Sequence, residues 1–322
     1  MFIHGLGGDA FKTWSHSSDH KNSWPYWLGK EFSNVGVWSI GYEASPIALP
    51  TVLGWVRRWW PEAGQSMALP HRALQLLDKL QRAGIGQRPL LFICHSLGGL
   101  VAKQILRTSR DTLGVKPRNV RFAQVAANTR AVLFLATPHT GAALASKLDA
   151  FREQFGTTVN MSDLKAHDAH LRNLFDWYRN HAPAIGIETI TYYEGQDVAN
   201  ALRIVNETSS HPGVGADPIM LDKNHISIAK PFDEGEDVYQ AACDLIRDHV
   251  LSSSSKDVVA IPTEYVASAS PQSVVVNLNV DRTLLDGASP NTRHLSGKLS
   301  YPVVFRCGRL SHGADSCEAS RG

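Results

Sequence analysis

Short apolar runs alternate with segments of helical pattern along most of the chain. Uninterrupted apolar runs of this length predict buried strands. The predicted strands are a first run leading into residues 4–5, then 37–40, 90–93, 131–136, 190–193 and 202–205. The helices predicted between and after them are 24–32, 71–83, 98–109, a region from 142 to 181, and 236–250. This alternation is typical of an α/β fold, in which helices cover both faces of a mostly parallel sheet.

The composition changes near Leu251, where a run of four serines begins. The chain beyond it is rich in Ser, Pro, Gly and Asn, with one β-like run at 273–280. Low-complexity segments bury too little apolar surface to offset the entropy lost on ordering. We therefore predict an α/β domain over 1–251. The tail, 252–322, is expected to be largely disordered or to form a small β module.

The overall composition is that of an ordinary globular protein. Charged residues make up 19% of the 322 residues and hydrophobic residues 43%. This length allows one large α/β domain with a sizeable core. The formal net charge of +2 gives no electrostatic reason to bind nucleic acid or an anionic membrane. We therefore expect no nucleic-acid partner.

The spacing of the cysteines does not predict a metal site. Cys94, Cys243, Cys307 and Cys317 include no C-x-x-C pair. Cys94 and Cys243 fall in apolar segments typical of a core, whereas Cys307 and Cys317 lie in the tail and could pair. So sparse a set of cysteines is typical of a reducing compartment. We expect no metal and no cofactor.

The chain opens on a strand-like run rather than on a signal peptide. No apolar run approaches the roughly 18 residues that a membrane-spanning helix needs. We therefore expect a cytoplasmic protein, with transient contact at a membrane surface left open. The start is abrupt for an α/β fold, which leaves room for further strands upstream.

The strongest chemical signal is the segment 94–99, Cys-His-Ser-Leu-Gly-Gly, which follows an apolar strand and opens a helix. A serine at such a turn is typical of a nucleophile elbow. The turn strains the backbone at Ser96, so Cys94 and Gly98 on either side must be small. The Leu97 N–H and the helix N-terminus would face a developing oxyanion. The plain alternative is a serine that only caps the helix.

A glycine-rich loop follows the first predicted strand, at residues 4–9, His-Gly-Leu-Gly-Gly-Asp. Such a loop brings a backbone N–H close to the substrate oxygen, and we expect Leu6 to supply it. A phosphate-binding loop would need a Lys-Ser/Thr pair, which is missing here. Gly7 and Gly8 could also form a simple turn.

The remaining groups follow in the order serine, acid, histidine that is typical of this arrangement. His225 lies after the last predicted strand and before the closing helix, where the base is expected. Glu194 directly follows a predicted strand and is our choice for the acid, with Asp197 and Glu207 as competitors. Surface charge is the plain alternative for each carboxylate. Three other histidines are weaker candidates for the base: His95, expected to point elsewhere, His139, expected near the pocket, and His211.

Several segments together resemble the serine-active-site-containing (lipase-like) protein family and, more distantly, the GPI inositol-deacylase-type lipases. They are His-Gly-Leu-Gly-Gly at 4–8, the elbow with 98–101, Ala-Thr-Pro-His-Thr-Gly at 136–141, Ser209-Ser210, Asn224-His225 and 229–231. The resemblance covers residues 2–251. It implies an α/β-hydrolase domain acting on carboxylic esters through Ser96, Glu194 and His225. Two positions depart from the family: Cys94 replaces Gly, and Asn224 replaces Asp.

The sequence therefore predicts a serine esterase or lipase that forms an acyl-enzyme on Ser96. We expect a small-molecule or lipid ester as substrate, and a thioester is not distinguished from it. The segment 44–70 contains Trp55, Trp59 and Trp60, which would form either an apolar lid or a helix packed on the core. The alternative function is a catalytically silent, hydrolase-like domain that regulates or binds a partner.

Overall fold

The computed structural model describes residues 1–5, 7–42, 69–111, 120–140, 161–197 and 205–252. Of residue 120 and of 161–168 it describes only the backbone. Residues 44–68 of the Trp-rich segment, residues 142–160 and the tail with its β-like run lie outside the described residues. The predictions for these segments stay predictions.

Six parallel strands form one sheet in the order β2-β1-β3-β4-β5-β6. In chain order they are β1 Phe2–Ile3, β2 Ser39–Ile40, β3 Leu90–His95, β4 Thr129–Leu135, β5 Glu188–Glu194 and β6 Ile219–Leu221. All six strands point the same way, so their carboxyl ends share one edge of the sheet. The polar groups that follow those ends are therefore brought together.

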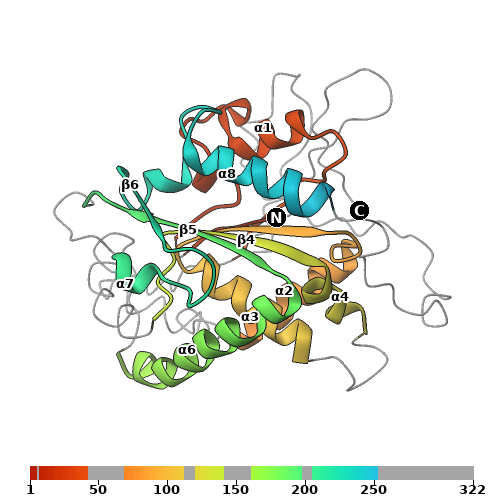
Figure 1. Ribbon diagram of the computed structural model, residues 1–322, viewed down its shortest axis with the longest axis vertical. Coiled ribbons are helices and arrows are strands. Elements are labelled where there is room, and N and C mark those ends of the chain that lie inside the picture. Colours follow the sequence, from red (N-terminus) through yellow and green to blue (C-terminus); the bar gives the residue numbers. More distant parts are fainter. Residues whose placement is uncertain (6, 43–68, 112–119, 141–160, 198–204, 253–322) are drawn as a thin grey trace, which may run out of the picture.

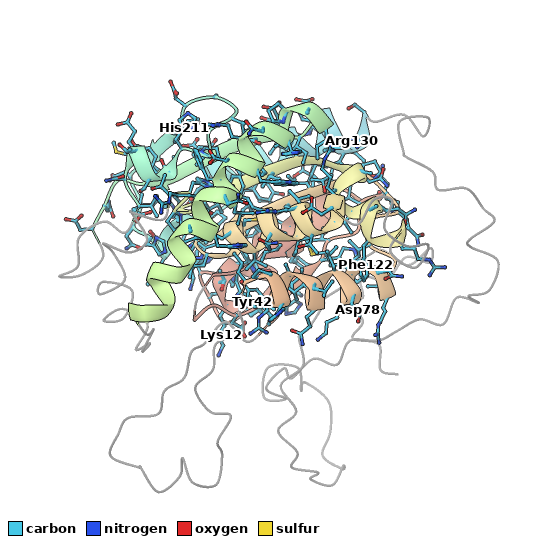
Figure 2. The ribbon with its side chains drawn as sticks, turned by 90° about the horizontal axis from the view of Figure 1, so that it is seen from below. Lys12, Tyr42, Asp78, Phe122, Arg130 and His211 are labelled. Carbon is cyan, nitrogen blue, oxygen red and sulfur yellow. The ribbon has the colours of Figure 1, made fainter. Side chains whose placement is uncertain are left out.

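Helices cover both faces of the sheet (Figure 1). The helices α1 Trp24–Glu31 and α8 Asp237–Leu245 lie on one face, where α8 continues as the π-helical turn η8 Ile246–Leu251. The other face carries α2 Leu69–Arg82, α3 Gly98–Asp111, α4 Val120–Asn128 and α6 Met161–His181. Figure 2 views this second face from below, with Asp78 of α2 and Phe122 of α4 labelled. The short helix α7 Glu207–Ser210 follows β5. The 3-10 turns are η1 Lys12–Trp14, η2 His20–Asn22, η6 Pro183–Ile185 and η7 Ser227–Ala229.

The central strands are apolar without interruption because both of their faces are buried. Leu91 and Ile93 of β3 pack into the core beneath α1 and α8. Phe92 and Cys94 pack into the core beneath α2 and α3. Successive side chains of a strand point to opposite faces, so one strand supplies both cores. The predicted α/β fold, a mostly parallel sheet with helices on both faces, is thus confirmed.

The sequence pattern did not predict the last strand of the sheet. The run 202–205 was predicted as the last strand, but β6, Ile219–Leu221, follows it in the chain. Val205 lies in a bend, and 202–204 lie outside the described residues. β6 is a short edge strand in which Ile219 and Met220 are about half exposed, at 48% and 55%. An exposed edge strand needs no buried apolar run, so the pattern that reveals central strands does not reveal it.

Helix α4 was not predicted from the sequence pattern either. It packs on α3, and the Oγ of Ser109 donates to the carbonyl of Phe122 and accepts from the N–H of Ala126 at 2.9 Å.

Among the described residues, no helix is both long enough and apolar enough to cross a membrane.

Lys103 of α3 is fully buried between the sheet and α6. Its Nζ lies 4.5 Å from the ring centroid of Tyr178 and 5.5 Å from those of Phe134 and Phe175. Within the described part of the chain, this nitrogen has no hydrogen-bond partner. Burial disfavours the charged amine and holds the pKa of Lys103 well below its usual value.

Replacing Lys103 by Met is expected to raise the free energy of unfolding at neutral pH by roughly 1–3 kcal/mol, the cost of an unpaired buried donor. Because the folded pKa is lowered, the unfolded chain binds more protons, and wild-type stability rises with pH up to the unfolded lysine pKa. The advantage of Lys103→Met should therefore shrink as the pH approaches about 10.4. Urea unfolding from neutral pH upward measures this, with the exposed Lys30→Met as control. If Lys103→Met is less stable than wild type at neutral pH, cation–π contacts with the surrounding aromatic rings compensate for burying the Lys103 ammonium.

Candidate active site

Ser96 lies in the turn between β3 and α3. Its φ of 53° is in the left-handed region, which is rare for any residue other than glycine. The Ser96 N–H donates to the carbonyl of Leu135 at 2.9 Å, and the Ser96 carbonyl accepts from the N–H of Gly99 at 3.1 Å. These two bonds tie the turn to β4 and to the first turn of the helix. Ser96 therefore stands at the carboxyl edge of the sheet in a fixed conformation.

Two glycines make this turn possible. A Cβ on Gly98 would collide with the carbonyl oxygen of Ile3 and would lie 2.6 Å from that of His4. A Cβ on Gly5 would lie 2.6 Å from the Cβ of Ser96 and 3.1 Å from its Oγ. The loop after β1 is thus pressed directly against Ser96. This explains why glycines stand at these two positions.

The side chains of Ser96, His225 and Glu194 form one hydrogen-bonded chain. The Oγ of Ser96 is 3.0 Å from Nε2 of His225, and Nδ1 of His225 is 3.2 Å from Oε1 of Glu194. Glu194 ends β5, and His225 follows β6. With the Ser96 hydroxyl donating to Nε2, Nδ1 carries the ring proton and donates to the carboxylate. The structure therefore brings together the three groups that the sequence selected from separate segments.

Glu194 is fixed by more than His225. Its Oε1 also accepts the backbone N–H of Val205 at 2.6 Å, and its Oε2 is buried with no partner among the described residues. Both Glu194 and His225 are 0% exposed. The two competing carboxylates lie in other surroundings: Asp197 and Glu207 are exposed, and Glu207 belongs to the first turn of α7.

The contact that His95 makes was not predicted from the sequence. Its ring makes no bond to Ser96, but its Nε2 lies 2.7 Å from the backbone carbonyl oxygen of His225. The two residues are 130 positions apart in the sequence, so no local pattern could reveal the contact. Because His95 and Ser96 are adjacent in the chain, the sequence indicated only that their side chains point in different directions.

The first loop is held by His4, whose ring stacks on Tyr42 at a centroid distance of 4.4 Å. Its Nδ1 donates to the carbonyl of Gly5 at 2.9 Å, which leaves Nε2 to accept the N–H of Tyr42 at 3.4 Å. Burial lowers the pKa of His4 and favours this neutral form. Leu97 lies in the turn before α3, whereas Leu6 lies outside the described residues. The roles of the Leu6 and Leu97 backbone N–H groups as oxyanion donors both stay predictions.

His139 and His211 are not bound to the Ser96 chain of hydrogen bonds. His139 is buried against Phe134, and neither ring nitrogen has a partner among the described residues. Burial, followed by repulsion from Lys103, holds the pKa of His139 well below its usual value. His211 is half-buried and accepts the N–H of Gly213 at 2.9 Å.

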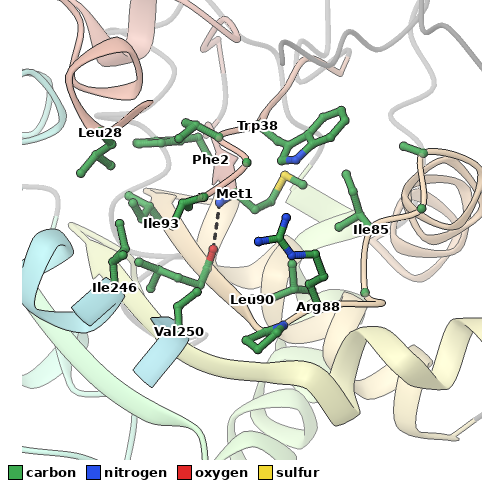
Figure 3. Close-up of a pocket in the computed structure, with 18 residues that line it drawn as sticks. Met1, Phe2, Leu28, Trp38, Ile85, Arg88, Leu90, Ile93, Ile246 and Val250 are labelled. Atoms are coloured by element: carbon green, nitrogen blue, oxygen red, sulfur yellow. Dashed lines mark hydrogen bonds between the residues drawn. The ribbon is translucent and has the colours of Figure 1, made fainter. Parts of the chain in front are cut away.

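A cavity of about 170 Å³ lies beside the first residues of β1 and β3 (Figure 3). Its lining includes Leu90 and, from the last helix, Val250. At its wall the amine of Met1 donates to the carbonyl of Leu91 at 2.9 Å. Ser96 follows the other end of β3, so this cavity is separate from the site.

Among the described residues, no three His, Cys, Asp or Glu side chains are grouped to hold a metal ion.

The fold and the site together define a class: an α/β protein with a serine at a strand-to-helix turn, hydrogen-bonded to a buried histidine and carboxylate. No family model matches the chain. It is similar to protein SERAC1 of Homo sapiens, at 30% identity over 269 residues, which are 77% of this chain and 38% of the human protein.

The chain is similar to protein SERAC1 of other vertebrates to a comparable degree. Protein SERAC1 of Mus musculus is 30% identical over 265 residues, 76% of this chain and 38% of the mouse protein. Protein SERAC1 of Danio rerio is 27% identical over 267 residues, 77% of this chain and 38% of the fish protein. The chain thus spans well under half the length of these relatives.

Proposed function

We propose that this protein is a serine hydrolase of the α/β-hydrolase type that cleaves carboxylic esters through an acyl-enzyme on Ser96. The observation that carries the proposal is the unbroken chain of hydrogen bonds from Ser96 through His225 to Glu194, at 3.0 and 3.2 Å. A hydroxyl is a weak nucleophile unless an adjacent base accepts its proton. Here His225 is that base, and the carboxylate of Glu194 orients it.

Each step of the reaction uses these three groups. Nε2 of His225 accepts the Ser96 proton as Oγ attacks the ester carbonyl carbon. The tetrahedral intermediate collapses, its C–O bond to the alcohol breaks, and Nε2 returns the proton to the leaving alkoxide oxygen. Water then attacks the acyl-enzyme in the same way, giving the carboxylic acid and free Ser96. Glu194 holds the productive tautomer of His225 and stabilises the imidazolium.

The negative charge of the tetrahedral intermediate needs donors that are already in place. We assign the backbone N–H of Leu97 and the N-terminus of α3 to this role, with the N–H of Leu6 as the second donor. The positive end of the helix macrodipole favours an anion there. The close approach of Gly5 to Ser96, which brings the first loop to the nucleophile, supports the assignment.

We propose an apolar acyl group, such as that of a lipid ester. The ground for this is the Trp-rich composition of the segment 44–70, which follows β2 in the chain and runs into the start of α2. An oxygen ester and a thioester would use the same serine, histidine and carboxylate.

One observation favours a second candidate, a catalytically silent domain that regulates or binds a partner. Ser96 is only 2% exposed, and His225 is 0% exposed. A nucleophile this deeply covered has to be uncovered before a substrate can reach it. Reactivity of Ser96 with a small electrophile separates the two functions.

A fluorophosphonate probe is expected to label the wild-type protein on Ser96, with hydrolysis of p-nitrophenyl esters that increases with acyl chain length. Ser96→Ala and His225→Ala should abolish labelling and lower kcat by roughly 10⁴-fold or more, since each removes an essential member of one unit. His211→Ala, which lies outside the hydrogen-bonded chain, is the matched control and should keep its activity. A folded wild-type protein that neither labels nor hydrolyses any ester would favour the silent domain.

The identity of the acid is tested by three amide substitutions. Glu194→Gln keeps the shape of the side chain but removes the charge, and kcat is expected to fall by about 10²- to 10⁴-fold. Asp197→Asn and Glu207→Gln alter exposed carboxylates and should stay within about twofold of wild type. Steady-state kinetics at one pH measures all three. If Asp197→Asn is the slow variant and Glu194→Gln is not, the acid has been misassigned.

A further inference from the structure

The ring of His95 lies between Trp14 and His225. Its centroid is 6.4 Å from that of Trp14 in an edge contact and 5.1 Å from that of His225. His95 is 7% exposed, and its Nε2 is 2.7 Å from the carbonyl oxygen of His225. The ring thus contacts both the side chain and the main chain of the residue that we propose as the base.

The partner atom defines which nitrogen of His95 is protonated. A carbonyl oxygen can only accept a hydrogen bond, so Nε2 must donate. Burial, with repulsion from His225 as the next cause, lowers the pKa of His95 to about 3. The ring is therefore neutral near neutral pH, and its single proton lies on Nε2.

The peptide group held by His95 lies inside a tight turn. The side chain of Asn224 accepts the N–H of Ile226 at 3.0 Å and that of Ser227 at 2.9 Å. The backbone N–H of Asn224 donates to the Oγ of Ser227 at 3.0 Å. Asn224 thus shapes the turn from within, while His95 connects the turn to β3. This connection links the loop that holds His225 to the end of β3, directly before Ser96.

We propose that His95 is a positioning residue, whose Nε2–H···O=C bond to the His225 peptide sets the distance between Nε2 of His225 and Oγ of Ser96. His95 and Ser96 are adjacent in the chain, so one strand end carries both the nucleophile and the anchor of the base. The inference rests on the proposed function. Displacements of about 1 Å in such an arrangement lower rates by about 10²-fold.

The competing explanation is that His95 only fills space between Trp14 and His225. Two substitutions separate the explanations. His95→Gln keeps an N–H donor at a similar distance from the main chain, whereas His95→Leu keeps apolar volume and has no donor. If packing alone matters, Leu should do at least as well as Gln at this buried position.

The test compares kcat, KM and the rate of fluorophosphonate labelling for wild type, His95→Gln and His95→Leu. His95→Leu is expected to lower kcat and labelling about 10- to 100-fold with KM within about twofold, because only the reacting groups are displaced. His95→Gln should recover most of the lost rate. Equal rates for the two variants, or a faster His95→Leu, would overturn the proposal.

A second measurement does not depend on how the variants fold. Nitrogen-15 NMR of histidine-labelled wild type reports the tautomer of each ring. The proposal requires His95 to be neutral with its proton on Nε2, and a proton on Nδ1 would overturn it. If wild type shows this tautomer but neither labels nor hydrolyses esters, the proposed function fails while the His95–His225 bond stands. That result would contradict the catalytic role of the hydrogen bond. A proton on Nδ1 of His95 would instead show that the hydrogen bond itself is not formed.

Discussion

The left-handed backbone of Ser96 is the constraint on which the rest of the site depends. It turns the chain from β3 into α3 within two residues and raises the hydroxyl at the carboxyl edge of the sheet. Such a conformation costs a non-glycine residue roughly 1–3 kcal/mol and persists only where its surroundings enforce it. The bond to Leu135 and the close contacts of Gly5 and Gly98 supply that enforcement.

Once the turn is fixed, the parallel sheet supplies the other groups. Glu194 ends β5 and His225 follows β6, so both arrive at the edge where Ser96 stands. All three side chains are almost fully buried, and hydrogen bonds in a medium of low dielectric constant are strong when made and costly when broken. Glu194 and His225 therefore stabilise each other, in contrast to Lys103, whose amine has no hydrogen-bond partner among the described residues.

The sequence predicted the elements whose signals are local. Buried central strands such as β3 and β4 are long apolar runs, and the elbow at Ser96 is a short motif in a recognisable context. The edge strand β6 carries no such signal because it is half exposed. Glu194 was chosen for its place at a strand end, with Asp197 and Glu207 as competitors, because only the three-dimensional structure shows which carboxylate reaches His225. The contact of His95 with the His225 peptide joins residues far apart in the chain, so it could not be predicted from any local pattern.

The central claim is that Ser96 and His225 act as a single catalytic unit, and non-additivity tests it most directly. kcat/KM for one activated ester is measured for wild type, Ser96→Ala, His225→Ala and the double variant, all checked for folding. If the two residues act as one unit, the double variant is no slower than either single variant. If the two losses multiply, the residues act independently, and the hydrogen bond between them is not the basis of the activity.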